Sequence, residues 1–261
     1  MKDNFYEEQV KRHGYWWSGD YSSWDEASLE CFGYDELNIV TQVKDTLLMV
    51  KDDQNRYERD GCVIYGEPEY AFELLKWIKE SSVDGVINLI DFGGSLGTTY
   101  HQLKKYLSEY TIIWNVVEQD GFVSVGREFI EDDVIKFYNT IDECLTHTTP
   151  NCFISSSALP YIENYSDILN EVYSHSFDWV LLDRISVVSG HNNVLSIQVV
   201  PPEVYKAIYP CWFFSESTLI DDVVSSGYEY LVGFDALGGR NFAPKIPTSA
   251  YRGFIFKKNK L

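Results

Sequence analysis

The chain has 261 residues, of which 21 are Lys or Arg and 40 are Asp or Glu, so its formal charge is −19. This balance argues against a general nucleic-acid binder, because proteins that bind a polyanion present a basic face to it. With 45% hydrophobic and 16% aromatic residues, the chain has enough apolar material for a core, which excludes a disordered tail. The length predicts one folded unit with room for a small extra lobe.

The chain begins with polar and acidic residues, where a secretory signal has an apolar run. No later stretch approaches the roughly 20 apolar residues of a membrane span, so the sequence predicts a cytoplasmic protein without a transmembrane segment. The five cysteines are odd in number and lie far apart, with no pair at zinc-ligand spacing. They are expected to be reduced and mostly buried, and no metal site is predicted.

Residues 1–68 are rich in Trp, Tyr and charge and carry helical signals. Ser23 followed by Glu26 fits a capping box, and apolar residues recur at near-helical spacing from Ile39 to Val50. We therefore expect a helical, aromatic-rich extension over residues 1–68, followed by a second domain over residues 69–261.

After Pro68, which suits the start of a helix ending near Glu80, strand-like and helix-like segments alternate. This alternation is typical of a parallel sheet with crossover helices. Buried strands are predicted at 86–91, 111–118, 135–138, 152–156 and 177–183, and a helix at 98–107. The end of the chain departs from this pattern, with a helix at 215–226, a strand at 228–234, a loop at 237–249 and a strand at 251–256. The predicted fold class is α/β: a Rossmann-like, mostly parallel seven-stranded sheet with an antiparallel edge hairpin.

The most informative stretch lies between the first of these strands and the following helix. It reads Asp91-Phe92-Gly93-Gly94-Ser95-Leu96-Gly97. Glycines at this position allow a sharp turn and a close approach of a ligand to the backbone, and the helix N-terminus offers free N–H groups. Twenty-one residues after Gly97, Glu118 ends the second strand, where a carboxylate can accept both hydroxyls of a ribose. The combination predicts a nucleoside-binding βαβ unit.

The details of this loop favour one nucleoside over others. A dinucleotide fingerprint has the spacing Gly-x-Gly-x-x-Gly and directs its helix toward a pyrophosphate. Here the glycines fall at 93, 94 and 97, and the carboxylate of Asp91 would repel a pyrophosphate but suits the ammonium and sulfonium groups of S-adenosylmethionine. Ser95 stands where a middle glycine is common. A tight turn without a ligand and a nicotinamide or flavin site remain alternatives.

Several motifs, in order along almost the whole chain, carry a resemblance to a known family. They are residues 17–24 (WSGDYSSW), 58–60 (ERD), 91–97 (DFGGSLG), 117–119 (VEQ), 182–184 (LDR), 201–205 (PPEVY) and 209–212 (YPCW). With these motifs the chain resembles class I S-adenosylmethionine-dependent methyltransferases associated with bacterial surface-polysaccharide biosynthesis. The resemblance implies a Rossmann-like cofactor fold with an aromatic N-terminal extension, and a reaction type more readily than a substrate.

Ligands of open α/β sheets bind beyond the carboxyl ends of the strands. On this basis and on the resemblance, the cofactor is S-adenosyl-L-methionine, and the residues expected to contact it are Asp91, Gly93, Gly94, Ser95, Gly97, Glu118, Gln119, Phe137 and Ser156. A serine after a strand is also common in a plain turn, and Phe137 is open to two interpretations, stacking on the adenine or packing in the core.

Methyl transfer to a sugar hydroxyl benefits from a general base, which contributes roughly 10²–10⁴-fold. Asp183 is the first candidate because it ends a buried strand at the active edge, and His191 in the following loop is the second. Pairing of Asp183 with Arg184 and a solvated His191 are the alternatives.

The acceptor side is expected to include residues from the later motifs. The resemblance implies Arg184, Tyr205, Tyr209 and Trp212, with residues 201–212 as a rigid loop. Arg240 opens a C-terminal segment that holds six basic residues and no acidic one, and it is a candidate contact for the phosphate of an activated sugar. An aromatic set suits either a sugar-stacking wall or an anchor for the extension: Tyr15, Trp16, Trp17, Tyr21 and Trp24.

The sequence thus predicts a methyltransferase that acts on a saccharide or an activated or lipid-linked sugar. Its expected partner is a small-molecule or saccharide acceptor rather than a nucleic acid, and a homodimer is compatible with the sequence. Two alternatives stay open: a catalytically silent module of the same fold, and a nicotinamide-dependent oxidoreductase, which Asp91 and the glycine spacing disfavour.

Overall fold

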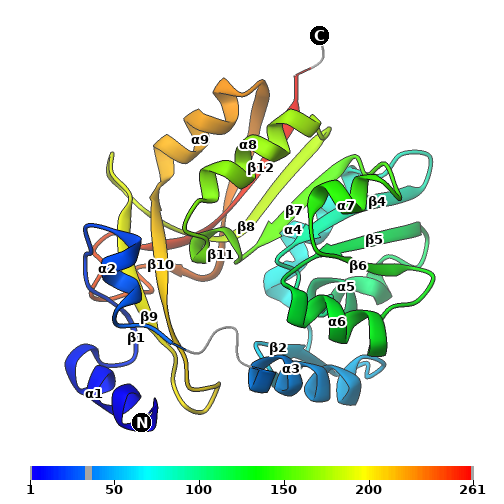
Figure 1. The fold of residues 1–261 in the computed structure, drawn as a ribbon. Helices are drawn as coiled ribbons and strands as arrows, with labels where there is room; N and C mark the ends of the chain where they lie inside the picture. Colours follow the sequence, from blue (N-terminus) through cyan, green and yellow to red (C-terminus); the bar gives the residue numbers. More distant parts are fainter. Residues whose placement is uncertain (1, 33–36, 260–261) are drawn as a thin grey trace.

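The computed structural model describes residues 2–32 and 37–259, and a single large sheet organises them (Figure 1). Five parallel strands form its centre in the order β6, β5, β4, β7, β8. Their bounds are β4 (Val86–Phe92), β5 (Thr111–Val117), β6 (Ile135–Tyr138), β7 (Cys152–Ser156) and β8 (Trp179–Val188). All five predicted parallel strands are therefore confirmed, with the last of them longer than expected.

The chain closes with a hairpin at one edge of these strands. Strand β12 (Ala250–Lys258) pairs antiparallel with β8, and β11 (Tyr228–Arg240) pairs antiparallel with β12. Together with the parallel strands this gives the order β6, β5, β4, β7, β8, β12, β11. The predicted Rossmann-like sheet of seven strands with an antiparallel edge hairpin is confirmed, although β11 extends into the predicted loop at 237–249.

Three further strands enlarge the sheet beside β8. Strand β9 (Val194–Val199) and β10 (Ile208–Ser215) form an antiparallel pair, β1 (Trp16–Ser18) adds to β9, and β10 joins β8 at Phe214 and Ser215. The expectation of a rigid loop over 201–212 is therefore wrong from residue 208 onward. Pro210 is tolerated within β10 because one side of the strand is unpaired there.

Helices cover both faces of the sheet, and the strands alternate between them. Along β4, Leu89 faces one buried cluster and Ile90 the other. The first cluster includes side chains of α3 (Leu37–Val50), α4 (Phe72–Glu80), α5 (Thr98–Leu103) and α6 (Asp120–Phe129). The second includes side chains of α7 (Ile141–Leu145), α8 (Tyr165–His175) and α9 (Glu216–Ser225). Short 3₁₀ turns lie at Glu69–Ala71, Lys104–Tyr106 and Leu159–Tyr161.

The first 68 residues are less uniform than the helical extension expected. They contain α1 (Lys2–His13), α2 (Trp24–Ser28) and α3, but also β1 and a separate hairpin of β2 (Arg56–Arg59) and β3 (Cys62–Tyr65). Ser23 caps α2, since its Oγ accepts a hydrogen bond of 3.2 Å from the N–H of Glu26. The Glu26 carboxylate bonds the N–H of Ser22 rather than that of Ser23. Within the described ranges, no helix is long and apolar enough to cross a membrane.

Candidate active site

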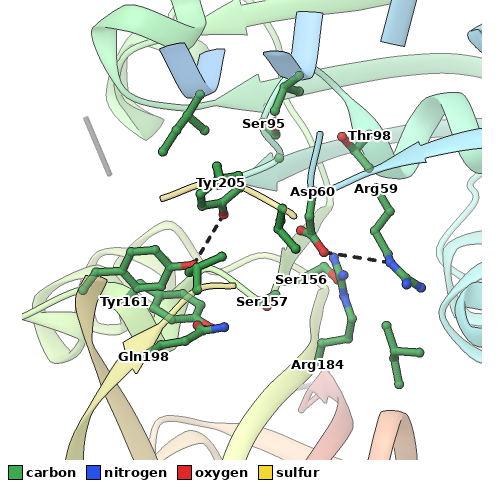
Figure 2. A pocket seen from close by; sticks show the side chains of 18 of the residues that line it. Arg59, Asp60, Ser95, Thr98, Ser156, Ser157, Tyr161, Arg184, Gln198 and Tyr205 are labelled. Atoms are coloured by element: carbon green, nitrogen blue, oxygen red, sulfur yellow. Dashed lines mark hydrogen bonds and ion pairs between the residues drawn. The ribbon is translucent and has the colours of Figure 1, made fainter. Parts of the chain in front are cut away.

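A cavity of about 320 Å³ opens at the carboxyl ends of the parallel strands (Figure 2). The loop after β4 contributes Gly93, Gly94 and Ser95, and the end of β5 contributes Glu118. Ser156 ends β7, and Arg184 belongs to β8. The other side is formed by residues of α3, by the turn between β2 and β3, and by the β9–β10 segment. This is the edge at which open α/β sheets bind their ligands.

The glycine loop is shaped by close contacts within the protein. Gly93 has a φ of +68°, and a Cβ there would lie 2.2 Å from Cβ of Ala158. A Cβ on Gly94 would lie 2.6 Å from Cγ of Asp91. Gly97 does not line the cavity; its φ is +79°, and a Cβ there would meet Ile135 at 2.2 Å. The loop therefore requires glycines for its own packing, in addition to any approach of a ligand.

Asp91 lies beneath this loop rather than in the cavity. Its side chain is fully buried, and Oδ2 accepts a hydrogen bond of 3.0 Å from the indole N–H of Trp114. Burial raises the pKa of Asp91 to about 6. Asp91 therefore does not face the cavity, where we expected it to contact a ligand. It packs against the glycine loop instead.

Glu118 is a half-buried carboxylate that lines the cavity. Its Oε1 accepts a hydrogen bond of 3.2 Å from the N–H of Ser95, and Oε2 accepts one of 2.7 Å from the N–H of Gln119. Burial raises the pKa of Glu118 to about 7. A carboxylate has about four acceptor positions, so two remain after these two bonds.

Besides Asp91 and Gly97, two more of the predicted cofactor contacts lie outside the cavity. Gln119 lines a neighbouring hollow at the start of α6. The ring of Phe137 is buried against α6, where a Cβ on Gly126 would lie 2.5 Å from it. Of the two interpretations of Phe137, the structure shows packing in the core.

Ser156, Asp183 and Arg184 form one hydrogen-bonded group where β7 ends beside the middle of β8. The hydroxyl of Ser156 donates to Oδ2 of Asp183 at 2.7 Å and accepts from Nε of Arg184 at 3.1 Å. Nε of Arg184 also lies 3.6 Å from Oδ2 of Asp183. Asp183 is only 1% exposed, burial raises its pKa, and it does not line the cavity. Its position is that of a support for Ser156 and Arg184.

His191 is not brought to the cavity either. Strand β8 runs on to Val188, so His191 falls on the exposed turn that leads to β9. The expectation that His191 lies at the active edge beside Asp183 is therefore corrected, because the strand continues beyond the point where the sequence placed its end.

The acceptor-side residues divide into two groups. Tyr205 and Tyr209 line the cavity, and their hydroxyl oxygens lie 3.4 Å apart. Trp212 instead packs beside Trp24, with ring centroids 6.0 Å apart, and does not line the cavity. Arg240 is exposed on β11, where its Nε lies 3.4 Å from Asp235, and it too lies outside.

The aromatic set of the N-terminal extension is also divided by the structure. Trp17 is 8% exposed and packs edge-on against the rings of Phe213 and Phe242, so it anchors β1. Trp16 is 45% exposed, and both Trp16 and Trp17 line the cavity. Tyr15 is also exposed, whereas Tyr21 and Trp24 pack against a cluster around β9 and β10.

The turn between β2 and β3 was missed as a site. Asp60 and Gly61 have φ of 53° and 72°, the left-handed pair of a tight Asp-Gly hairpin turn, and this dipeptide is a hairpin signal in the sequence. Glu58 precedes the turn, is 2% exposed, and accepts a hydrogen bond of 2.5 Å from the hydroxyl of Thr98. Burial raises the pKa of Glu58 to about 7. Arg59 and Asp60 line the cavity beside it.

Left-handed backbone conformations gather around this cavity. Among the described residues, nine that are not glycine have a clearly positive φ, and five of these line the cavity. They are Trp16, Asp60, Ser95, Ser157 and Arg184. Such conformations cost energy and persist where the surrounding structure imposes them, which is typical of functional sites.

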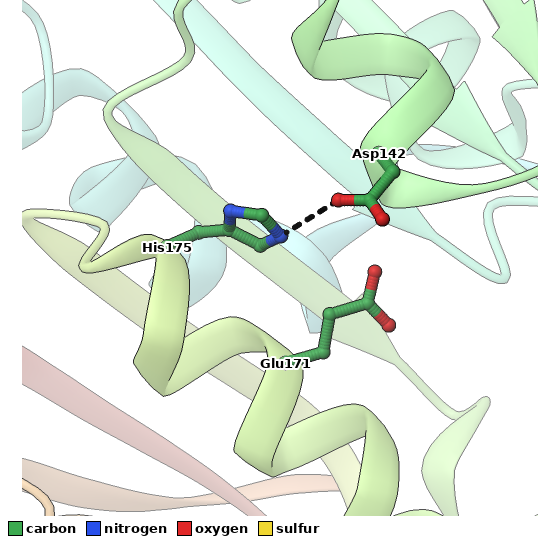
Figure 3. Close-up of side chains that lie close together, drawn as sticks. All are labelled: Asp142, Glu171 and His175. Carbon is green, nitrogen blue, oxygen red and sulfur yellow. Dashed lines mark ion pairs between the residues drawn. The ribbon is translucent and has the colours of Figure 1, made fainter.

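A second cluster of ligand-type side chains lies away from the cavity (Figure 3). Asp142 of α7 and Glu171 and His175 of α8 each bring one ligand-type atom within 4.8 Å of the others. Nε2 of His175 lies 3.2 Å from Oδ1 of Asp142, and the Asp142 side chain is 80% exposed. An exposed ion pair explains this arrangement without a metal ion.

Comparisons with known proteins give matches to structures only. No family model matches the sequence, and the search of curated proteins finds no match. The chain is similar in fold to the CcbJ methyltransferase from Streptomyces caelestis, with 11% identity, 85% of this chain and 99% of that chain covered, and a TM-score of 0.49. It is also similar to 1,6-didemethyltoxoflavin-N1-methyltransferase from Burkholderia thailandensis, with 11% identity, 93% of each chain covered and a TM-score of 0.48. A third is the amino pentose methyltransferase CalS10 from Micromonospora echinaspora, with 9% identity, 73% and 91% covered, and a TM-score of 0.46.

Proposed function

We propose that the chain is an S-adenosylmethionine-dependent methyltransferase. The observation that carries this proposal is Glu118, a half-buried carboxylate directly after β5 that lines the cavity beside the β4 loop. The N–H groups of Ser95 and Gln119 fix its orientation, and its two remaining acceptor positions suit the two hydroxyls of a ribose. The cavity volume falls within the usual range for a small-molecule site.

The residues present also fit the rest of this cofactor. Gly93, Gly94 and Ser95 form one wall of the cavity, where we place the methionine portion. The glycines fall at 93, 94 and 97 rather than in the spacing Gly-x-Gly-x-x-Gly, which disfavours a dinucleotide. When bound, S-adenosylmethionine supplies an electrophilic methyl group on sulfur.

For the acceptor we propose a saccharide hydroxyl. The wall opposite the glycine loop combines aromatic rings with hydrogen-bonding groups: Trp16, Tyr161, Gln198, Tyr205 and Tyr209. The hydroxyl of Tyr161 donates to Oε1 of Gln198 at 2.8 Å, which fixes both groups. Flat rings with polar edges suit the faces and hydroxyls of a sugar ring.

Catalysis then rests on placement. An in-line displacement needs the acceptor oxygen, the methyl carbon and the sulfur aligned, and holding them so can supply much of the rate enhancement. Ser156 and Arg184 are held by the buried carboxylate of Asp183, so their positions are fixed before an acceptor binds. The hairpin turn at Asp60 and the β9–β10 segment enclose the cavity from the other side.

The test has two stages on the same sample. Calorimetry with S-adenosylhomocysteine and with the reduced nicotinamide dinucleotide distinguishes the two cofactor classes, and we expect binding of the first only. Transfer of labelled methyl groups from S-adenosylmethionine to a saccharide panel then tests activity. The sample is first shown to be folded by circular dichroism. If it does not bind S-adenosylhomocysteine at millimolar concentration, the proposal is excluded.

A second candidate function, a binding module of the same fold, is favoured by one observation. Neither of the two bases predicted from sequence lines the cavity, since Asp183 is buried and His191 is exposed elsewhere. Cofactor binding combined with no methyl transfer to any member of the panel would support this candidate over the enzyme.

A further inference from the structure

Two arginines meet on one aromatic ring at the acceptor side of the cavity. The guanidinium carbons of Arg59 and Arg184 lie 5.4 and 5.5 Å from the ring centroid of Tyr70. Arg59 comes from the β2–β3 hairpin and Arg184 from β8, so the two charges are joined by the fold rather than by the local sequence. Both line the cavity.

The guanidinium of Arg184 has donors to spare. Its side chain is 14% exposed, and Nε is used by Ser156. Among the residues that the structure describes, neither terminal nitrogen of Arg184 has a hydrogen-bond acceptor. Leaving the donors of a half-buried charge unpaired within the protein costs free energy, whereas a carboxylate or phosphate can accept two of them at once.

Asp60 is a loosely held counter-ion beside this pair. Figure 2 shows its side chain reaching toward both Arg59 and Arg184. Its Oδ2 lies 3.9 Å from Nε of Arg59, which is too long for a hydrogen bond, and the side chain is 62% exposed. An anion that reaches the arginines can therefore replace Asp60 without breaking a short hydrogen bond.

The location of the pair assigns it to the acceptor rather than to the cofactor. Glu118 ends β5 and Arg184 lies on β8, three strands away in the order β5, β4, β7, β8. At about 4.8 Å between neighbouring strands, this separation is about 14 Å. With the ribose at Glu118 and the methionine portion over the β4 loop, the side of the cavity at Arg184 is left for the acceptor.

We propose that the acceptor carries an anionic group, a carboxylate or a phosphate, and that Arg184 and Arg59 bind it in place of Asp60. That the bound molecule is a methyl acceptor rests on the proposed function. The anion site itself does not depend on that function. It also replaces Arg240 as the contact for such a group, since Arg240 lies outside the cavity.

The test uses defined probes on the full chain saturated with S-adenosylhomocysteine. Glucuronate, glucose 1-phosphate and neutral methyl glucoside are titrated by calorimetry. We expect the two charged probes to bind at least tenfold more tightly than the neutral one, and the tighter of the two identifies the anionic group. Arg184→Gln should lower the affinity for the charged probe at least tenfold, because it removes the charge and the paired donors of the guanidinium group.

Two further variants sharpen the test. Asp60→Asn should tighten binding of the charged probe by about fivefold, because it removes a competing negative charge beside both arginines. Arg240→Gln is a matched change outside the cavity. It should leave the affinity for the charged probe within twofold of the wild-type value. Arg59→Gln, on a more exposed hairpin, gives a second loss-of-charge variant if Arg184→Gln does not fold.

Several outcomes would overturn the inference. They are equal affinity for charged and neutral probes, full affinity in both arginine variants, and displacement of S-adenosylhomocysteine by the anion, which would mean that the arginines hold the cofactor carboxylate. If wild type does not bind S-adenosylhomocysteine, the proposed function fails separately, and the same titrations on the ligand-free chain still decide whether the anion site exists.

Discussion

Replacing Glu118 by glutamine removes the charge at the point where we place the ribose, while the shape of the side chain is kept. In the structure both carboxylate oxygens accept backbone N–H groups, at 3.2 Å and 2.7 Å, and each keeps one acceptor position toward the cavity. A glutamine offers a single oxygen, so one ribose hydroxyl loses its acceptor and one N–H faces an NH₂ group. A hydrogen bond to a charged group contributes about 1.5–3 kcal/mol, which corresponds to a loss of affinity of about 10- to 150-fold.

Calorimetric titration of S-adenosylhomocysteine at pH 8 measures this loss, with Glu128→Gln on the exposed side of α6 as the matched control. The pKa of Glu118, which is about 7, allows a second test by changing the pH. Because the ionised form is the better acceptor, wild-type affinity should fall about tenfold from pH 8 to pH 6, while Glu118→Gln should show little change. Equal affinity of wild type and Glu118→Gln at pH 8 would refute the placement of the ribose.

Three further predictions concern the loop, the extension and the pH dependence of stability. Gly94→Ala brings a Cβ to 2.6 Å from Asp91, so it should lower the free energy of unfolding by about 1–3 kcal/mol and weaken S-adenosylhomocysteine binding; an unchanged Tm would contradict the packing described. Trp17→Ala should cost about 3–5 kcal/mol in urea unfolding, whereas Trp16→Ala at the exposed neighbouring position should stay within about 0.5 kcal/mol; similar losses would show that β1 is anchored otherwise. The folded-state pKa of Glu58 is about 7 against an ordinary 4.5, so the folded chain holds this proton more tightly, and about 3 kcal/mol of stability present below pH 4.5 is lost as the pH rises through 7. Urea midpoints from pH 5 to pH 8 should therefore fall more steeply in wild type than in Glu58→Gln, and parallel curves would contradict this.

The central sheet could be predicted because its strands are buried on both faces. Runs such as Val86-Ile87-Asn88-Leu89-Ile90 read as nearly continuous apolar segments, and the glycines after β4 mark the turn that follows. The β9–β10 pair could not be recognised in the same way. Buried polar residues, Ser196 and Gln198, interrupt the apolar pattern of β9, and Pro210 argues locally against a strand in β10.

The site was predictable only where chain order determines position. Glu118 and the β4 loop follow adjacent parallel strands, so their meeting at one edge of the sheet follows from the topology. The hairpin that carries Arg59 and Asp60 has no such relation to the sheet, and its place over the cavity depends on packing of α3 and α5. His191 was misplaced because the length of β8 is set by its pairing with β10 and β12, which local sequence does not report.

The central claim is that the cavity between the β4 loop and Glu118 holds S-adenosylmethionine. A crystal structure of the chain with S-adenosylhomocysteine tests it most directly. We expect both ribose hydroxyls on the Glu118 carboxylate, the methionine portion along Gly93 and Gly94, and the sulfur directed toward Ser156 and Arg184. Ligand bound elsewhere, or a ribose that does not contact Glu118, would contradict it.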